Sequence, residues 1–340
     1  MDLVVAKGNH FDMGLAIGRA AREKISRAVD YYRLVLVEEG LPEGWVIPAS
    51  YLEAAGEDFP GYVEEIMGMA RGSGQDFETL FLLNSLEEAL TVPAPSACTS
   101  LGFLREGEAY LGHNEDWYRE DSHHAILIHG RPKGKPEFVS VTAAPFLPAV
   151  GMNECGVAQG INSVSCRDRR PGVPIMFSSR AVLEAENIDE AIARALPPRR
   201  AGGYNHLLVS AEGRLGNLET SACQHHFAPE DRSTFHTNHY VSPAMAPLER
   251  GPSRSSLSRY SRCRELRETL EMNENPVKAI TEVLRDHGEY PYSICRHPQG
   301  EGITVRATIF SLVFDVRCFH VWVTEGNPCL GDFQLYTGLG

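Results

Sequence analysis

The chain has 340 residues, of which 43% are hydrophobic, enough for one large domain or two medium ones with a real core. Its formal net charge of −13 argues against nucleic acid as a partner, because phosphate binding requires a clustered positive surface. No apolar run approaches the roughly 18 residues that would span a bilayer, and the first residues lack the basic start and apolar core of a secretory signal. We therefore expect a cytoplasmic protein with no membrane or nucleic-acid partner.

The first ninety residues have the pattern of helices. Residues 12–39 form a long amphipathic segment, with apolar residues at three- and four-residue spacing. Shorter helices are expected over 60–74, with Gly72 and Gly74 as the stop, and over 76–90.

Strand-rich sequence comes next. The clearest signal is a hairpin over 100–117 that turns at Glu106-Gly107. Further strands are expected within 125–132, 136–144, 146–164, 204–222, 233–241 and 304–326. Helices are expected within 178–196, 255–272 and 276–287, and the arginines of 255–272 are expected on its exposed face. Strands and helices arrive in blocks, which favours a layered α+β architecture.

One cysteine stands apart from the other seven. The eight cysteines are scattered without a C-x-x-C pair, and most should be buried thiols. Cys98, however, precedes a strand that leads into a dense polar cluster at 113–117. A cysteine nucleophile needs a base or a lowered pKa. Two bases remain open: His113, or the α-amino group of Cys98 itself, which becomes available only if the Ala97–Cys98 bond is cut.

The sequence around this bond suits self-cleavage. The Cys98 thiol can attack the carbonyl carbon of Ala97, and water can hydrolyse the resulting thioester. The small residues Ala94 and Ser96 leave room for a tetrahedral intermediate, and the neighbouring prolines favour an extended connection. The cut would fall where helical sequence changes to strand-rich sequence.

The chain resembles the acyl-CoA:6-aminopenicillanate acyltransferase family, whose members are N-terminal-nucleophile (Ntn) hydrolases that activate themselves by autoproteolysis at a cysteine. The resemblance rests on an ordered set of stretches: "KGNHFDMGLAIGRAAREKI", "ACTS" followed by "GHNEDW", "GMNECGVAQGINS", "HTNHY", "SSLSRYSRCRELRE", "LRDHGEYPYSICRH" and "ATIFSLVFDVRCFHVWVTEGNPC". It implies a four-layer αββα sandwich with a helical N-terminal segment. Residues 1–97 would be a helical pro-segment or alpha chain, packed on a catalytic beta chain of residues 98–340 in one structural domain.

The resemblance also implies roles for individual residues. Cys98 would be both the autoproteolytic and the catalytic nucleophile, with Ala97 on the other side of the cut. Asp116 would hold or orient the Cys98 amine, and Trp117 would line the acyl pocket. Asn238 would stabilise the oxyanion, and Arg306 would be the family's late arginine near the nucleophile.

Three further residues are expected at the substrate: Thr99, Asn114 and Asn162. The implied enzyme is a cysteine amidohydrolase or acyltransferase that forms a Cys98 thioester with small N-acyl amides. An acyl-CoA or another thioester is the alternative donor, and water or an amine is the acceptor. No cofactor is expected. If the chain is cleaved, the pieces form an alpha–beta heterodimer that is free to dimerise further.

Two other hypotheses remain open. One is an unprocessed cysteine amidase that uses His113 as its base. The other is a non-catalytic member of the fold that binds a small molecule or a partner.

The histidines raise the question of a metal. On a strand, His236 and His239 would point to opposite faces, so they could not easily share an ion. Asp286, His287, Cys295 and His297 could form a Cys-His site. The resemblance instead implies a loop that packs against the sandwich, and no metal is expected.

Overall fold

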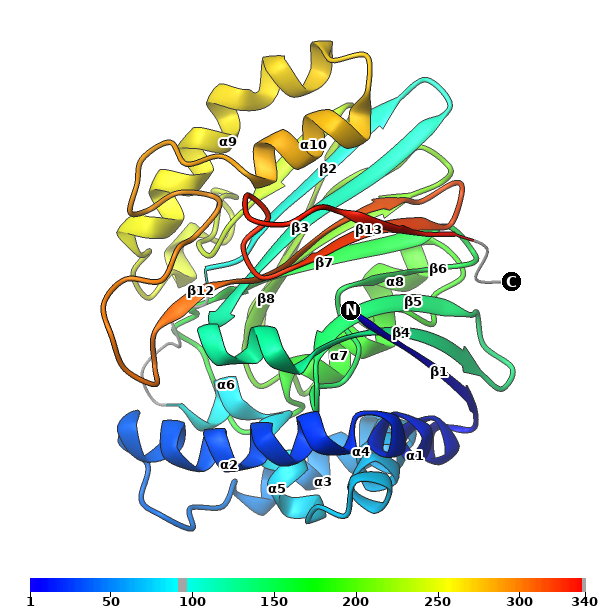
Figure 1. Cartoon of the computed structure of the whole chain (residues 1–340), viewed down its shortest axis with the longest axis vertical. Helices are drawn as coiled ribbons and strands as arrows, with labels where there is room; N and C mark the ends of the chain where they lie inside the picture. Colours follow the sequence, from blue (N-terminus) through cyan, green and yellow to red (C-terminus); the bar gives the residue numbers. More distant parts are fainter. Residues whose placement is uncertain (91–96, 338–340) are drawn as a thin grey trace.

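The computed structural model describes residues 1–90 and 97–337, which form two stacked β-sheets covered by helices on both outer faces (Figure 1). The chain is therefore an α+β protein with the four-layer αββα architecture, as predicted. The two sheets approach closely, because Gly102 carries no side chain where it faces Leu207 and Val209 of the other sheet.

The larger sheet has eight strands within the described residues. Their spatial order is β1 (Asp2–Gly8), β4 (Ala125–Pro132), β5 (Phe138–Ala143), β6 (Gly151–Asn153), β7 (Val157–Val164), β8 (Gly203–Ser210), β9 (Leu215–Thr220) and β10 (His225–Glu230). β1 pairs in parallel with β4, from Asp2 opposite Ile126 to Gly8 opposite Pro132. The prediction that the first ninety residues are helical was therefore wrong for β1, which belongs to the sheet of the proposed catalytic part.

The smaller sheet carries the residues around Cys98. Its order is β11 (Ser233–His236), β2 (Thr99–Arg105), β3 (Glu108–Tyr118), β12 (Arg306–Asp315), β13 (His320–Glu325) and β14 (Gln334–Tyr336). β2 and β3 form the predicted hairpin, and Gly107 takes the positive φ of 77° that its turn requires. β3 is central to the site, because it pairs with β2 on one side and with β12 on the other.

Helices cover both sheets and one end of the sandwich (Figure 1). They are α1 (His10–Ala20), α2 (Arg22–Glu38), α3 (Ala49–Asp58), α4 (Pro60–Ser73), α5 (Phe77–Leu83), α6 (Leu86–Ala89), α7 (Ile175–Val182), α8 (Ile188–Arg194), α9 (Arg254–Met272) and α10 (Pro276–Leu284), with short 3-10 turns at Arg119–His124 and Ala246–Leu248. α9 and α10 pack on the smaller sheet, where Ile280 and Leu284 join Leu101 and Phe103 in a buried cluster. α7 and α8 pack against β8 of the larger sheet.

α1 and α4 cross at very short range because glycines line the contact. A Cβ atom on Gly14 would lie 1.8 Å from the carbonyl oxygen of Glu65, and one on Gly68 would lie 2.2 Å from that of Phe11. Such distances leave room only for glycine.

A buried ionic cluster joins the N-terminal helices to the rest of the chain. Arg180 of α7 is fully buried, and its guanidinium lies 3.1 Å from Glu65 of α4 and 3.3 Å from Glu184. The same guanidinium stacks over the rings of Tyr62 and Phe138. This contact holds α4 against α7.

Several predicted boundaries change. The segment 12–39 is divided between α1 and α2 at Ala21, and Gly72 lies inside α4, which ends before the left-handed Gly74. The strand expected over 233–241 ends at His236. α3, β10 and β14 were not anticipated. The expected extended connection at Pro93 and Pro95, with Ala94 and Ser96, falls in 91–96, outside the described residues. Across residues 1–90 and 97–337, no helix has the length and apolar character needed to cross a membrane.

Candidate active site

Cys98 lies immediately before β2, and its thiol begins a row of polar side chains between the two sheets. The buried thiol donates a hydrogen bond to Glu115 Oε1 at 3.1 Å. Glu115 Oε2 lies 3.0 Å from His113 Nε2, and His113 Nδ1 lies 2.9 Å from Ser100 Oγ. Strand alternation explains the row: Ser100 pairs with His113, so Cys98 and Glu115, each two residues away, meet on the same face.

The environment of Cys98 opposes thiolate formation in the uncut chain. Burial raises the pKa of the thiol well above its ordinary value, and the negative charges of Glu115 and Asp116 raise it further. The thiol would therefore need a proton acceptor to form a thiolate. Glu115 is the carboxylate in direct contact with it.

Asp116 lies on the opposite face of β3 from Glu115 and is fully buried. Its Oδ1 accepts a hydrogen bond of 2.6 Å from the hydroxyl of Thr308, and its Oδ2 has no hydrogen-bond partner among the described residues. Burial raises the pKa of Asp116 to about 7, although the positive charges of Arg259 and Arg296 oppose the shift. This carboxyl group can thus change its protonation state near neutral pH.

Arg259 of α9 links three parts of the site. Its Nη1 donates to the carbonyl oxygen of Cys98 at 2.6 Å and to Thr99 Oγ1 at 2.9 Å, and its Nη2 donates to Asn238 Oδ1 at 2.8 Å. The side chain is fully buried, so the expectation that the arginines of this helix are exposed was wrong for Arg259. Burial lowers its pKa to about 10, which leaves it charged at neutral pH.

Asn238 follows β11 and is fixed from several directions. Besides the bond from Arg259, its Nδ2 donates to the carbonyl oxygen of Ser163 at 3.1 Å, and its backbone N–H donates to Ser256 Oγ at 2.7 Å. The structure therefore brings Asn238 and Cys98 to the same guanidinium group. Thr99 is the third residue bound to Arg259, and it is not among the residues that line the cavity next to Trp117. Its expected contact with substrate remains a prediction.

Asn114 is hydrogen-bonded within the core. Its Nδ2 donates to the carbonyl oxygens of Leu284 and Ile294 at 2.9 and 3.0 Å, and its Oδ1 accepts from Ser311 Oγ at 2.6 Å. These contacts tie β3 to the layer of α10. The amide of Asn114 is thus occupied within the core, and its expected contact with substrate remains a prediction.

Arg306, the first residue of β12, is hydrogen-bonded to β3 and to the residue that follows α2. Its Nη2 donates to Tyr118 OH at 3.2 Å and to Glu39 Oε1 at 3.3 Å, and its guanidinium carbon lies 5.8 Å from the centre of the Trp117 ring. No hydrogen bond or ion pair among the described residues joins it to Cys98. The expected place of Arg306 near the nucleophile remains a prediction, and Arg259 is the arginine that donates to the backbone carbonyl of Cys98.

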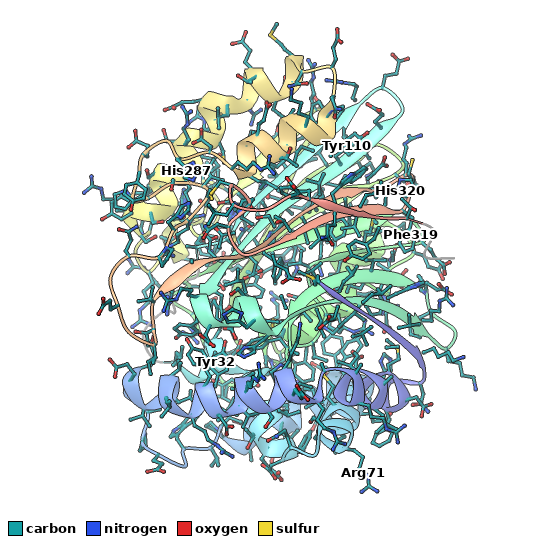
Figure 2. All side chains as sticks on the ribbon, viewed as in Figure 1. Tyr32, Arg71, Tyr110, His287, Phe319 and His320 are labelled. Carbon is teal, nitrogen blue, oxygen red and sulfur yellow. The ribbon has the colours of Figure 1, made fainter. Side chains whose placement is uncertain are left out.

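A cavity of about 650 Å³, its open mouth included, lies beside this row of residues. Trp117 lines this cavity, and its indole Nε1 donates to Tyr32 OH at 2.7 Å. Its expected role in an acyl pocket remains a prediction. Figure 2 places Tyr32 where α2 faces the sheets. Most of the wall is apolar and includes Leu86, Val141, Phe146, Ile161, Ile309 and Phe310. Glu115 belongs to this wall and so connects the cavity with Cys98.

The polar part of the cavity wall is acidic. It includes Glu87, Glu88 and Glu115, together with Tyr204. Glu87 accepts hydrogen bonds from the hydroxyls of Ser163 and Tyr204. Burial raises the pKa of Glu87, and burial followed by the repulsion of Glu87 raises that of Glu88 to about 7.

Asn162 of β7 lies outside the residues that line this cavity. It is buried, and its Oδ1 accepts from Asn205 Nδ2 at 3.3 Å. Its Nδ2 has no hydrogen-bond partner in the described part of the chain, so it retains a free donor. Its role at the substrate remains a prediction.

Sequence reasoning missed Glu115 and Arg259, although both left signals. Alternation along β3 puts Glu115 on the face of His113, the residue considered as a base. On α9 the buried positions Ser256, Arg259 and Cys263 have three- and four-residue spacing, so Arg259 falls on the inward stripe.

The two-sheet sandwich, with a buried cysteine at the start of a central hairpin, is the arrangement of an Ntn-type cysteine amidohydrolase or acyltransferase. The sequence model of the acyl-coenzyme A:6-aminopenicillanic acid acyl-transferase family matches residues 103–329. The chain belongs to this family and is an enzyme that acts on C–N bonds. The resemblance noted in the sequence is thereby confirmed.

Relatives of the chain include both acyltransferases and hydrolases. The chain is 26% identical over 335 residues to the 40 kDa form of acyl-coenzyme A:6-aminopenicillanic-acid-acyltransferase of Emericella nidulans, covering 96% of this chain and 92% of that protein. It is 30% identical over 217 residues to the β-alanyl-dopamine/carcinine hydrolase of Drosophila melanogaster, covering 56% and 55%.

Two solved structures are also similar to the chain. Penicillin V acylase of Agrobacterium tumefaciens matches at 16% identity and a TM-score of 0.46, covering 67% of this chain and 83% of that one. A variant of the conjugated bile acid hydrolase of Clostridium perfringens matches at 12% identity and a TM-score of 0.48, covering 71% and 97%.

Proposed function

We propose that this enzyme is a self-processing Ntn amidohydrolase that cleaves its own Ala97–Cys98 bond. The observation that carries the proposal is the hydrogen bond between the buried Cys98 thiol and Glu115. As sulfur attacks the Ala97 carbonyl carbon, Glu115 accepts the thiol proton. Collapse of the tetrahedral intermediate breaks the C–N bond, the Cys98 nitrogen takes a proton, and a thioester remains. Water then hydrolyses the thioester, which releases the Ala97 carboxylate and the free thiol.

In the processed enzyme, the new α-amino group of Cys98 serves as the base for substrate attack. Asp116 holds this amine, a role supported by its buried Oδ2, which has no hydrogen-bond partner within residues 1–90 and 97–337. Asn238 donates to the developing oxyanion, and Arg259 fixes its amide by binding Oδ1. The acyl group passes to Cys98 as a thioester and then to water or an amine. None of these steps uses a cofactor.

The cavity supports a preference among acyl groups. Its three glutamates disfavour an acyl chain that ends in a carboxylate and favour one that ends in an ammonium group. We therefore propose small N-acyl amides with an amine-bearing acyl group, such as β-alanyl amides, as substrates. This is the acyl group in the name of the Drosophila relative. Comparing hydrolysis of N-β-alanyl and N-succinyl amides of one amine tests this preference. Faster turnover of the succinyl compound would refute it.

The decisive test of processing is the intact mass of the denatured protein beside a Cys98→Ala variant. We expect two fragments that divide between Ala97 and Cys98, and a single full-length chain in the variant. One full-length mass in both proteins would rule out self-cleavage.

An unprocessed amidase is the second candidate, because Cys98, Glu115 and His113 form a continuous row with ligand-type atoms within 4.8 Å of one another. It predicts amide hydrolysis by the uncut chain and loss of that activity in His113→Ala. A binding protein without activity predicts neither fragments nor turnover, and a Cys98 thiol that stays unreactive towards acyl donors.

A further inference from the structure

Four side chains with metal-binding atoms converge far from Cys98 in the sequence. They are His287, Cys295, His297 and Cys329, hereafter the Cys2His2 cluster. The first three lie in the long segment between α10 and β12, and the fourth follows β13. Figure 2 shows His287 on this segment, near α9 and away from the N-terminal helices. One ligand-type atom from each residue lies within 4.8 Å of all the others.

Four of the six distances between the ligand-type atoms are close to the edges of a coordination tetrahedron. For zinc bonded to sulfur at about 2.3 Å and to nitrogen at about 2.05 Å, the tetrahedral edges are about 3.8 Å between sulfurs, 3.6 Å between sulfur and nitrogen, and 3.3 Å between nitrogens. The structure has 3.6 Å between Cys295 Sγ and Cys329 Sγ. His297 Nε2 lies 3.8 and 3.2 Å from these two sulfurs and 3.0 Å from His287 Nε2.

We propose that the Cys2His2 cluster binds one zinc ion. Two thiolates and two imidazoles in a tetrahedron are the donor set that zinc prefers among the common divalent ions. All four positions are filled by protein, so the site has no open position for substrate and its role is structural. This replaces the expectation from the sequence that no metal is bound, which weighed Asp286 as a ligand and lacked Cys329.

The scaffold holds the two contributing segments together without the ion. Arg285 donates to the carbonyl oxygens of Pro328 and Gly331, both at 2.8 Å. Asn327 Nδ2 donates to the carbonyl oxygen of Arg296 at 2.7 Å and lies 3.6 Å from Cys295 Sγ. Amide donors directed at ligand sulfurs are typical of the outer shell of thiolate sites. The cluster is therefore preorganised.

The site is connected to the active centre through one residue. Arg296 lies between the ligands Cys295 and His297, and its backbone N–H donates to Thr308 Oγ1 at 3.0 Å. The same hydroxyl donates to Asp116 at 2.6 Å. A zinc ion on the flanking residues would fix this segment and thereby the hydroxyl that orients Asp116.

The first experiment is elemental analysis of the full-length protein, purified without chelator. We expect about one zinc per chain in the wild type. In Cys329→Ser we expect the zinc content to be reduced by about tenfold or more. Cys155→Ser is the matched control, because Cys155 is exposed and distant in sequence, and its zinc content should equal that of the wild type. Equal zinc in all three proteins would place the metal elsewhere and overturn the proposal.

A second measurement uses the unaltered chain, so that misfolding of a variant cannot obscure the result. The protein is stripped of metal with a chelator under reducing conditions and titrated with Co²⁺. Saturation at about one equivalent, with the intense visible bands of tetrahedral cobalt and a thiolate charge-transfer band, supports the proposal. A pale spectrum without thiolate charge transfer overturns it. The proposal is also overturned if the wild-type protein is lighter than its sequence mass by two hydrogens and the difference maps to a Cys295–Cys329 disulfide.

Discussion

Replacing Arg180 by methionine tests whether the buried ionic cluster between α4 and α7 holds the N-terminal helices in place. Methionine has a similar length and no charge, so the variant leaves Glu65 and Glu184 buried without their cation. Removing one partner of a buried ion pair costs roughly 3–5 kcal/mol of the free energy of unfolding. For 340 residues the unfolding entropy is roughly 0.7 kcal/mol/K, so Tm should fall by about 4–7 °C.

The stability that Arg180→Met loses should depend on pH in a definite direction. Burial raises the pKa of Glu65, but Arg180 and the hydrogen bond to His10 outweigh it, so the pKa is lowered overall. A lowered pKa stabilises the fold above the ordinary glutamate pKa, and this stabilisation is lost as pH falls through the lowered value. The difference between wild type and Arg180→Met should therefore shrink on acidification.

Denaturant unfolding followed by circular dichroism measures the effect, with Arg199→Ala as the matched control. Arg199 also pairs with two carboxylates, Glu57 and Asp58, but its side chain is 41% exposed. Exposed pairs contribute about 0–1 kcal/mol. A loss below about 1 kcal/mol in Arg180→Met, or an equal loss in Arg199→Ala, would refute the reasoning.

Three further predictions concern the site and the fold. Glu115→Gln should slow the appearance of the processed fragments by about 10²-fold or more, because it removes the proton acceptor of the Cys98 thiol. An unchanged rate on time-resolved gels would exclude Glu115 as that acceptor. Thr308→Val removes the hydroxyl that lowers the pKa of Asp116, so this pKa should rise in the variant. The acidic limb of the turnover–pH profile should therefore move to higher pH. An unmoved limb would contradict the role given to Asp116. Gly14→Ala should destabilise the protein by about 1–3 kcal/mol in the same unfolding assay, because the new Cβ would meet the α4 backbone. Its control is Gly56→Ala on α3, where the new Cβ would enter open space. This control should be neutral or stabilising by up to about 1 kcal/mol.

Local signals in the sequence predicted local structure well. The hairpin around Glu106-Gly107 is confirmed, because turn chemistry and alternation act over a few residues. The pairing of β1 with β4 joins positions more than a hundred residues apart, and no local pattern encodes a partner. The strand pattern before Asn9 is short, and the strong helical periodicity of residues 12–39 outweighed it in the prediction.

The residues of the candidate site were likewise predicted only in part from the sequence. The resemblance located Cys98, Asp116 and Asn238, and the structure brings the first and last to one guanidinium. It did not identify Arg259, because Arg259 is one of several arginines on its helix and such arginines are usually solvated. The hydrogen-bond partners of Arg306 could not be predicted, because its position at the start of a recognisable strand does not decide which groups its long side chain reaches.

The position of β1 has a practical consequence for producing the enzyme. A chain that starts at Cys98 would lack β1 and leave one side of β4 unpaired. Seven of the eight residues of β4 are buried, all except Arg131. An open, apolar edge of this kind recruits strands from other molecules. Direct expression of residues 98–340 should therefore yield aggregates, and co-expression with residues 1–97 should restore a dispersed protein.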